Sequence, residues 1–193
     1  MKVLVATTNP NKLREIRPLL TGVELVTLAE LAPVPEPDET GATFWENARI
    51  KALAYAAATG LTTVAEDSGF EVDALGGEPG VRSARFLGPA ATYDARFAEI
   101  YRRLAGRRAE ARFVTALAVA TGDTILFETE TVIEGIVAEG ARGEHGFGYD
   151  PIFWYPPFGR TTAELTDPEK ATVSHRGRAF RDFRRWLKTS HGQ

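Results

Sequence analysis

The sequence predicts an α/β fold with a mixed β-sheet flanked by helices, and two features of the chain support this prediction. In the first half, short apolar runs alternate with segments of helical periodicity, as strands joined by helices do. In the middle, residues 111–121 and 124–138 form two long strand-like runs on either side of Gly122-Asp123, which predicts a hairpin. Helix-linked strands together with a hairpin favour a mixed sheet over a purely parallel one.

The elements of the first half follow from apolar runs and helix caps. Lys2–Thr7 is expected to form a buried strand, and Asn9, followed by a proline, is a good N-cap for a helix. Val23–Thr27 is the next expected strand. Residues 33–41 hold three prolines and three acids and are expected to form a stiff loop. The capping box Thr43–Glu46 then predicts a helix.

In the second half, strands and helices are again separated by turn residues. Thr62–Glu66 is expected to be a short strand that stops at a polar triplet, and residues 92–104 have the spacing of an amphipathic helix. Residues 113–119 alternate with period 2, which is typical of a strand with one buried face. A Gly-rich loop over residues 140–148 precedes an expected strand, Pro151–Tyr155.

Composition bounds the class of protein. The 193 residues suit one domain, residues 1–193, and 44% hydrophobic with 25% charged residues excludes a disordered chain. A net charge of -3 gives no reason to expect a nucleic-acid or membrane partner, and zero cysteines exclude disulfides and thiolate metal sites. The N-terminus turns polar at Thr7, so no signal-peptide core is expected, and we expect a cytoplasmic protein.

Lysine is rare in this chain, which makes its positions informative. Only five of the 23 basic residues are lysines, and three of them lie in segments with candidate chemistry: Lys12, Lys51 and Lys170. Arginine serves for most surface charge here, so a lysine at such a position suggests a need for a compact ammonium. Chance placement on solvated helix faces is the alternative.

The first candidate site is a strand–loop–helix segment. Thr7, Thr8, Asn9, Pro10, Asn11 and Lys12 run from the expected strand into the expected helix. A helix N-terminus offers free backbone N–H groups and a positive dipole end, which favour phosphate, and Lys12 adds a charge. The segment lacks the glycines of a Walker loop, and an ordinary capped helix has the same pattern.

The second candidate site is acidic. Glu39 lies in the proline-rich loop, and Glu66-Asp67 are expected to end a strand just before Ser68 and a glycine. Carboxylates on a rigid loop and at a strand end can converge, and Mg²⁺ typically takes one or two of them together with phosphate oxygens. A remaining carboxylate could activate water. Acids that simply face solvent are the alternative.

Two further candidate sites lie towards the C-terminus. Phe147, Gly148, Tyr149 and Asp150 follow another glycine, and an aromatic ring between glycines is well placed to stack on a flat base. Lys170 precedes Ser174-His175-Arg176, where basic residues begin the last helix. The helix dipole disfavours cations there unless an anion compensates. An edge aromatic and a decorated helix start are the alternatives, and Trp45 and Trp154 are interpreted as packing residues.

Together these segments resemble the Ham1-type inosine triphosphate pyrophosphatase family over nearly the whole chain. Each motif is weak alone, but their order is specific. The segments that carry the resemblance are Thr7–Lys12, Glu39–Phe44 with Glu46–Ala48 and Lys51-Ala52, Glu66–Gly69, Gly76–Val81 with Ser83–Arg85, Gly146–Phe153 and Ser174–Arg176. Glu66 departs from the aspartate often found there, and Pro10 removes one N–H donor.

The resemblance implies an elongated mixed sheet with two lobes and a central active-site cleft, usually in a homodimer. The implied reaction converts ITP, dITP or XTP and water into the monophosphate and pyrophosphate, with Mg²⁺ as cofactor. Residues 7–12 would hold the triphosphate. Glu39 and Asp67 would bind the metal, with Asp67 as catalytic base. Lys51, Ser68 and Lys170 would contact the substrate, and residues 147–150 with His175-Arg176 would form the base pocket.

Two alternatives remain open from the sequence. A Maf-type nucleotide pyrophosphatase resembles this fold, but it is expected to carry an arginine-rich first loop, which residues 9–12 are not. A non-catalytic nucleotide-binding or nucleic-acid-binding module is the second alternative. The acidic net charge and the retained carboxylates argue against it.

Overall fold

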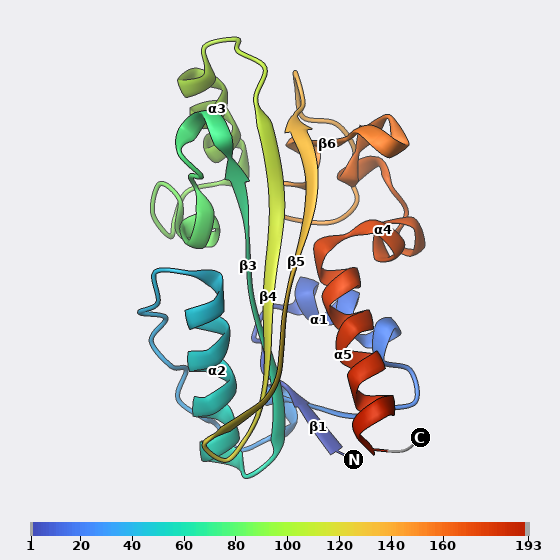
Figure 1. Ribbon diagram of the computed structural model, residues 1–193. Helices are drawn as coiled ribbons and strands as arrows, with labels where there is room; N and C mark the ends of the chain where they lie inside the picture. The colour runs from blue at the N-terminus through green and yellow to red at the C-terminus, as the bar shows by residue number, and fades with distance from the viewer. Residues whose placement is uncertain (1, 192–193) are drawn as a thin grey trace. The chain divides into compact units, whose positions relative to one another are not determined.

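The computed structural model describes residues 2–191, which build a mixed α/β fold around a seven-stranded sheet (Figure 1). The strands are β1 (Lys2–Val5), β2 (Glu24–Thr27), β3 (Thr62–Val72), β4 (Glu110–Thr121), β5 (Thr124–Val137), β6 (Phe153–Tyr155) and β7 (Arg160–Thr161). Their order is β2-β1-β3-β4-β5-β6-β7. β1 is parallel to β2 and β3, whereas β6 is antiparallel to β5 and β7. The predicted mixed sheet is confirmed.

The helices begin at the caps that the sequence indicates. They are α1 (Pro10–Ile16), α2 (Phe44–Thr59), α3 (Tyr93–Leu104), α4 (Asp167–Val173) and α5 (His175–His191). Asn9, Thr43, Thr92 and Thr166 are the N-caps of the first four, and Gly60 ends α2 in the left-handed conformation. None of the helices within residues 2–191 is long and apolar enough to cross a bilayer.

The chain divides into two compact units, each formed by segments that are distant in the sequence. Unit 1 holds the chain up to residue 67, residues 115–131 and the chain from residue 175 on. Unit 2 holds residues 68–114 and 132–174. The three long strands β3, β4 and β5 each contribute residues to both units.

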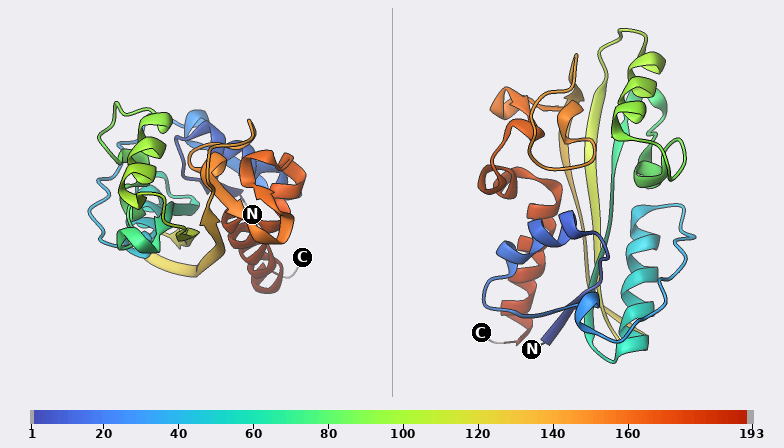
Figure 2. Two further views of the ribbon diagram at one scale, coloured as in Figure 1. Left: turned by 90° about the horizontal axis from the view of Figure 1, so that it is seen from above. Right: turned by 180° about the vertical axis from the view of Figure 1, so that it is seen from behind.

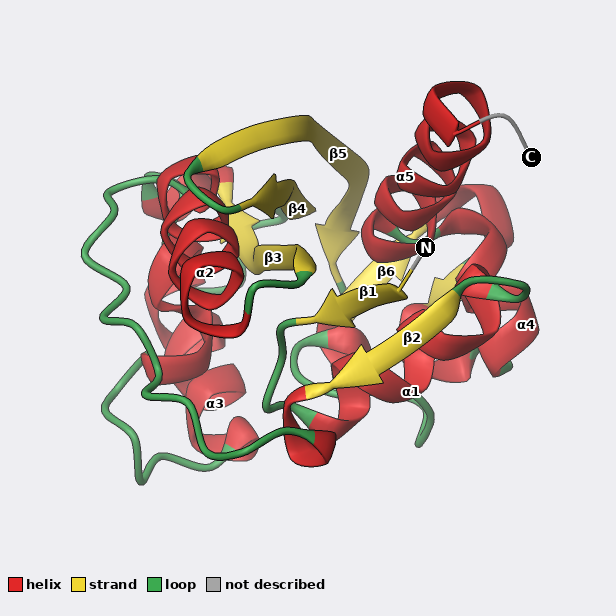
Figure 3. Cartoon of the chain, turned by 90° about the horizontal axis from the view of Figure 1, so that it is seen from below, coloured by secondary structure: helices red, strands yellow, loops and turns green. Residues whose placement is uncertain are grey.

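The core of unit 1 lies between the sheet and two helices. Ile16 of α1 and Phe180 and Phe183 of α5 pack against Val5 of β1 and Val64 of β3. Figure 2 shows α1 and α5 side by side, and Figure 3 shows α2 on the opposite side of β1 and β3 from α5. The sheet in this unit is therefore covered by helices on both faces.

The core of unit 2 is aromatic. Phe70 of β3, Phe113 of β4 and Phe153 of β6 contact one another, with ring centroids 4.8–6.1 Å apart. Phe97 and Ile100 of α3 belong to the same buried cluster. The amphipathic spacing of residues 92–104 thus predicted the face of α3 that packs inward.

Two predictions about the strands were wrong. β3 does not end at Glu66 but continues to Val72, because Phe70 and Val72 are fully buried and carry the strand into unit 2. The polar triplet at residues 67–69 lies within a strand rather than at a turn. In β4, residues 113–120 are all buried, so the predicted alternation of buried and exposed positions is absent. A central strand covered on both faces has no solvent side.

Candidate active site

The first predicted loop, residues 7–12, is a capped helix start in unit 1. The Asn9 side chain accepts hydrogen bonds from the backbone N–H groups of Asn11 at 2.9 Å and Lys12 at 3.3 Å, and Pro10 lies in the first turn of α1. The sequence suggested that N–H groups here are free for a phosphate, but the cap already engages these two. The charge that this segment offers to an anion is therefore the Lys12 ammonium.

Lys12 belongs to an ion-pair cluster that joins α1, β3 and α5. Its Nζ lies 3.6 Å from Glu66 Oε1, and the same oxygen accepts a hydrogen bond from Arg176 Nε at 2.7 Å. Arg176 Nη1 also donates to Glu15 Oε2 at 2.7 Å. The side chains of Glu66 and Arg176 are each 2% exposed. Two carboxylates and two cations thus balance one another inside unit 1.

Burial and pairing oppose each other in this cluster. Burial alone would raise the pKa of Glu66, but Arg176 and Lys12 outweigh it and lower that pKa to about 2. For Lys12 the effect of burial prevails, so its pKa is lowered even though Glu66 raises it. The two carboxylates raise the pKa of Arg176 against the effect of burial. Glu66 is therefore ionised at neutral pH, and its charge opposes the lowering of the Lys12 pKa by burial.

The environment of Arg176 also explains the basic start of α5. The sequence suggested that an anionic ligand compensates the unfavourable dipole interaction at this helix end. Glu66 and Glu15 supply two anions from the protein itself. Of the oxygens of these two carboxylates, Glu66 Oε2 is buried without a hydrogen-bond partner among the described residues. An ordered water or a polar ligand would satisfy it.

A second ion-pair cluster in unit 1 lies on α2. Lys51 Nζ is 2.6 Å from Glu39 Oε1 and 3.3 Å from Asp67 Oδ1. Asn47 Nδ2 donates to Asp67 Oδ2 at 3.1 Å. Burial alone would lower the pKa of Lys51, but Asp67 and Glu39 outweigh it and raise that pKa. Two carboxylates, one from the proline-rich loop and one from β3, therefore converge on a protonated lysine.

The two clusters are separated because Glu66 and Asp67 are neighbours in one strand. Successive side chains of a strand point to opposite faces of the sheet. Glu66 accordingly pairs with residues of α1 and α5, and Asp67 with residues of α2. The convergence predicted for Glu39 and Asp67 is present, whereas Glu66 joins a different set of partners.

Glu39 and Asp67 fit a magnesium ion by their chemistry. Mg²⁺ is commonly held by one or two carboxylates, with phosphate oxygens and waters completing six ligands. Glu39 and Asp67 gather around a cation, the Lys51 ammonium, so positive charge is already favoured there. No group of three or more acidic, histidine or cysteine residues that could hold a metal occurs within the described chain. The two carboxylates of Glu39 and Asp67 match the one or two protein ligands that Mg²⁺ commonly takes.

A third cluster lies in unit 2 and joins Asp150, Lys170 and Phe147. Lys170 Nζ is 2.5 Å from Asp150 Oδ2, and this oxygen also accepts a hydrogen bond from the Phe147 backbone N–H at 2.7 Å. Thr162 Oγ1 donates to Asp150 Oδ1 at 2.8 Å. The Lys170 ammonium lies 5.2 Å from the Phe147 ring centroid. Asp150 thereby fixes both the lysine and the backbone that carries the aromatic ring.

Gly146 and Tyr149 show how tightly this segment is built. Gly146 has φ +72°, and a Cβ there would lie 2.2 Å from Asp150 Oδ2 and 2.9 Å from Lys170 Nζ, so only glycine fits. Tyr149 is a core residue whose ring stacks on Phe70 with centroids 5.0 Å apart. Its hydroxyl donates to the Ser83 carbonyl at 2.9 Å, and burial raises its pKa.

The remaining predicted residues are placed as follows. Thr7 Oγ1 accepts a hydrogen bond from the Asn9 N–H at 3.1 Å, and Ser68 is half-buried in β3. His175 is buried, and its carbonyl accepts a hydrogen bond from Thr131 Oγ1 at 2.7 Å. Thr8 is exposed at the start of the loop.

Two residues of the clusters in unit 1, Asn47 and Glu15, were not recognised as site residues from the sequence. Asn47 lies four residues before Lys51 and Glu15 lies three residues after Lys12, so each shares a helix face with a site lysine. Helical spacing from the rare lysines was the signal that could have found them. All three lysines that the sequence singled out pair with a carboxylate of a site cluster: Lys12, Lys51 and Lys170.

A sequence model of the Ham1 family matches residues 3–186 of the chain. Among curated relatives, a dITP/XTP pyrophosphatase from an Exiguobacterium species is 47% identical over 184 residues, 94% of each chain. A dITP/XTP pyrophosphatase from Thermus thermophilus is 49% identical over 185 residues, 94% of this chain and 89% of the relative.

Solved structures with the same fold are also similar in sequence. A HAM1 protein from Coxiella burnetii superposes with a TM-score of 0.90 at 37% identity, covering 98% of this chain and 99% of the other. A nucleoside-triphosphatase / dITP/XTP pyrophosphatase from Mycobacterium abscessus superposes with a TM-score of 0.75 at 46% identity, covering 95% and 98%. The match extends over nearly the full length of each chain.

Proposed function

The chain belongs to the Ham1 family, and we propose that it hydrolyses noncanonical purine nucleoside triphosphates such as ITP, dITP and XTP. The products are the nucleoside monophosphate and pyrophosphate. Relatives of 47% and 49% identity that are dITP/XTP pyrophosphatases support this substrate class. The reaction removes these nucleotides from the pool.

The observation that carries the proposal is the convergence of Glu39 and Asp67 on the Lys51 ammonium. We infer that this pair holds Mg²⁺ when substrate is bound. The chemistry that the ion supplies there is neutralisation of phosphate charge. Lys51, which stays protonated, adds a further positive charge on the same side of β3. Lysines and a divalent ion around a triphosphate are the parts that phosphoryl transfer requires.

Asp67 is proposed as the general base. Asn47 and Lys51 each contact one of its two oxygens, which fixes the orientation of the carboxylate. In the reaction it accepts a proton from the water that attacks the α-phosphorus. The bond between the α- and β-phosphates breaks, and pyrophosphate leaves with the electron pair.

We propose that residues 7–12, with Lys12 as their cation, bind the triphosphate. Ser68 and Lys170 are proposed further substrate contacts. Phe147 is proposed to stack on the base, and its backbone is held by Asp150, a residue of the proposed base-binding segment 147–150.

Arg176, with His175, is proposed to select the base. A guanidinium only donates hydrogen bonds, so it suits the 6-keto oxygen of hypoxanthine or xanthine and not the 6-amino group of adenine. Glu66 and Glu15 hold the guanidinium in one orientation through their ion pairs. A buried polar group that is left unpaired by the wrong base costs about 1–3 kcal/mol.

Two further expectations from the family resemblance remain proposals: a homodimer and a cytoplasmic location. The oligomeric state is measured by light scattering of the purified protein, and a monomer at micromolar concentration would contradict the first. The non-catalytic alternative is settled by the turnover assay described next.

The test is pyrophosphate release from ITP, XTP, dITP, GTP, ATP and UTP, with Mg²⁺ and with a chelator. We expect turnover of the first three only with Mg²⁺. Asp67→Asn should reduce it by at least about 10²–10³-fold while the fold is retained, because it removes charge and base together. Asp38→Asn, the same change at an exposed residue of the proline-rich loop, is the matched control and should be neutral. Near-normal turnover in folded Asp67→Asn would refute the assignment.

A further inference from the structure

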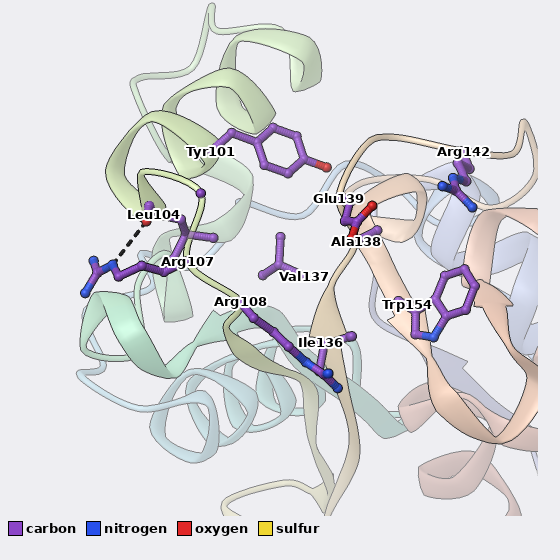
Figure 4. Close-up of a pocket in the computed structure, with 11 residues that line it drawn as sticks. Tyr101, Leu104, Arg107, Arg108, Ile136, Val137, Ala138, Glu139, Arg142 and Trp154 are labelled. Carbon is purple, nitrogen blue, oxygen red and sulfur yellow. Dashed lines mark hydrogen bonds between the residues drawn. The ribbon is translucent and has the colours of Figure 1, made fainter.

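Unit 2 contains a cavity of about 670 Å³ that shares no residue with the proposed active site (Figure 4). It lies between the C-terminal end of α3 and the turn after it, the end of β5 with the following loop, and β6. Small-molecule sites commonly have volumes of about 300–1,000 Å³. Trp154, which the sequence suggested was a packing residue, lines this cavity.

The lining of the cavity includes apolar side chains and two aromatic rings. Ile136 and Val137 at the end of β5 and Ala138 just after it form apolar lining, while Tyr101 and Trp154 come from α3 and β6. The Tyr101 hydroxyl is buried and has no hydrogen-bond partner within residues 2–191. Burial raises the pKa of Tyr101, so the hydroxyl remains a donor. Such a group normally has a partner, which a ligand or water would supply.

The charges at the cavity are mostly positive. Three arginines and one glutamate line it. Arg107 is engaged elsewhere, because its guanidinium donates to the carbonyls of Leu104 and Arg103. In the described part of the chain, the Arg108 and Glu139 side chains make no hydrogen bond or ion pair. The Arg142 guanidinium lies over the Trp154 ring, 5.9 Å from its centroid, in a cation–π contact.

These features complement one class of ligand. A flat heterocycle suits the Trp154 face and the apolar lining. A phosphate suits Arg108 and Arg142, since guanidinium groups bind phosphate oxygens through charge-assisted hydrogen bonds. Sugar hydroxyls or ring N–H groups can donate to Glu139, which only accepts when ionised. A nucleoside monophosphate carries all three groups in a size that the cavity admits.

We propose that this cavity is a second nucleotide site that binds a nucleoside monophosphate, with the phosphate at Arg108 and Arg142 and the base against Trp154. The proposed reaction releases a ligand of this class, which would be one source of nucleotide for this site. The proposal concerns a cavity within unit 2 and does not depend on the mechanism of hydrolysis.

The test is calorimetric titration of the whole protein with IMP in a chelator. We expect two classes of site in the wild type, one of them at the proposed active site. Arg108→Ala should weaken one class by about tenfold or more, the loss of one charge-assisted hydrogen bond. Trp154→Leu should weaken the same class. Arg102→Ala on α3, whose exposed guanidinium pairs with Glu99 and does not line the cavity, is the matched control and should bind as wild type.

Titrations with inosine and with inorganic phosphate test which parts of the nucleotide the cavity recognises. Inosine and inorganic phosphate should each bind the cavity more weakly than IMP, because each lacks one of the complementary groups. If phosphate alone binds as tightly as IMP and Trp154→Leu has no effect, the cavity is a simple anion site and the proposal is wrong. Unchanged IMP titrations in both cavity variants would also overturn it. ITP turnover by Arg108→Ala is expected to be normal. Normal turnover shows that the variant is folded, and it tests the proposed hydrolysis independently of binding at the cavity.

Discussion

Replacing Glu66 by glutamine removes a negative charge from the interior of unit 1 while nearly preserving the shape of the side chain. The Glu66 carboxylate is 2% exposed and pairs with Arg176 and Lys12. Lowering its pKa from 4.5 to about 2 corresponds to about 3 kcal/mol of stability, at about 1.36 kcal/mol per pKa unit. We expect Glu66→Gln to lose about that much at pH 7, because the buried Arg176 cation loses one of the two carboxylates that pair with it, Glu66 and Glu15.

The sign of the pH dependence follows from the direction of this shift. A carboxyl whose pKa is depressed in the folded state stabilises the fold above its unfolded pKa of about 4.5, and this stabilisation is lost as the pH falls towards 2. The wild type should therefore lose roughly 1 kcal/mol of its advantage over Glu66→Gln by pH 3.5. Below that pH the two proteins should converge further.

The assay is urea unfolding of both proteins between pH 3.5 and pH 7 in a chelator, which keeps metal charge out of the measurement. Glu24→Gln, at an exposed glutamate of β2, is the matched control and should stay within about 0.5 kcal/mol of the wild type. A stability difference between wild type and Glu66→Gln that is below about 1 kcal/mol, or that does not change with pH, would refute the reasoning.

Three further variants test the proposed substrate contacts through kcat and KM. Lys12→Ala should mainly raise KM for ITP, and unchanged kcat and KM would show that the first loop is only a helix cap. Arg176→Lys keeps a cation beside Glu66 but loses the guanidinium fork. The ratio of kcat/KM for ITP to kcat/KM for ATP should therefore fall about 10-fold or more. Equal losses of kcat/KM for both nucleotides would instead make Arg176 a phosphate contact. Phe147→Ala should lower kcat/KM for all purines alike, because stacking ignores base identity; a loss confined to ITP would contradict this.

Local signals in the sequence determined most of the elements. Asn9, Thr43, Thr92 and Thr166 are side chains that satisfy N–H groups two or three residues ahead, so their effect does not depend on distant parts of the chain. The apolar face of α3 followed from 3.6-residue spacing in the same way. The hairpin was placed by its Gly122-Asp123 turn.

The sequence was less informative about strands that are buried on both faces of the sheet. β4 was expected to alternate, but its residues 113–120 are buried throughout, because the sheet is covered on both sides. β3 was expected to stop at its acids. Polar residues inside a strand resemble a turn when only the sequence is seen, and the core contacts of Phe70 and Val72 that extend the strand are made with distant segments.

The sequence by itself determined the residue types of the site, the family they resemble and the helices and strands that carry them. Only the tertiary structure decided which charges meet. Lys12 and Arg176 are separated by most of the chain, yet they share one oxygen of Glu66. Asp67, the next residue, faces Lys51 instead. The physical reason is that a strand turns neighbouring side chains to opposite faces, and the helices packed on each face supply their partners.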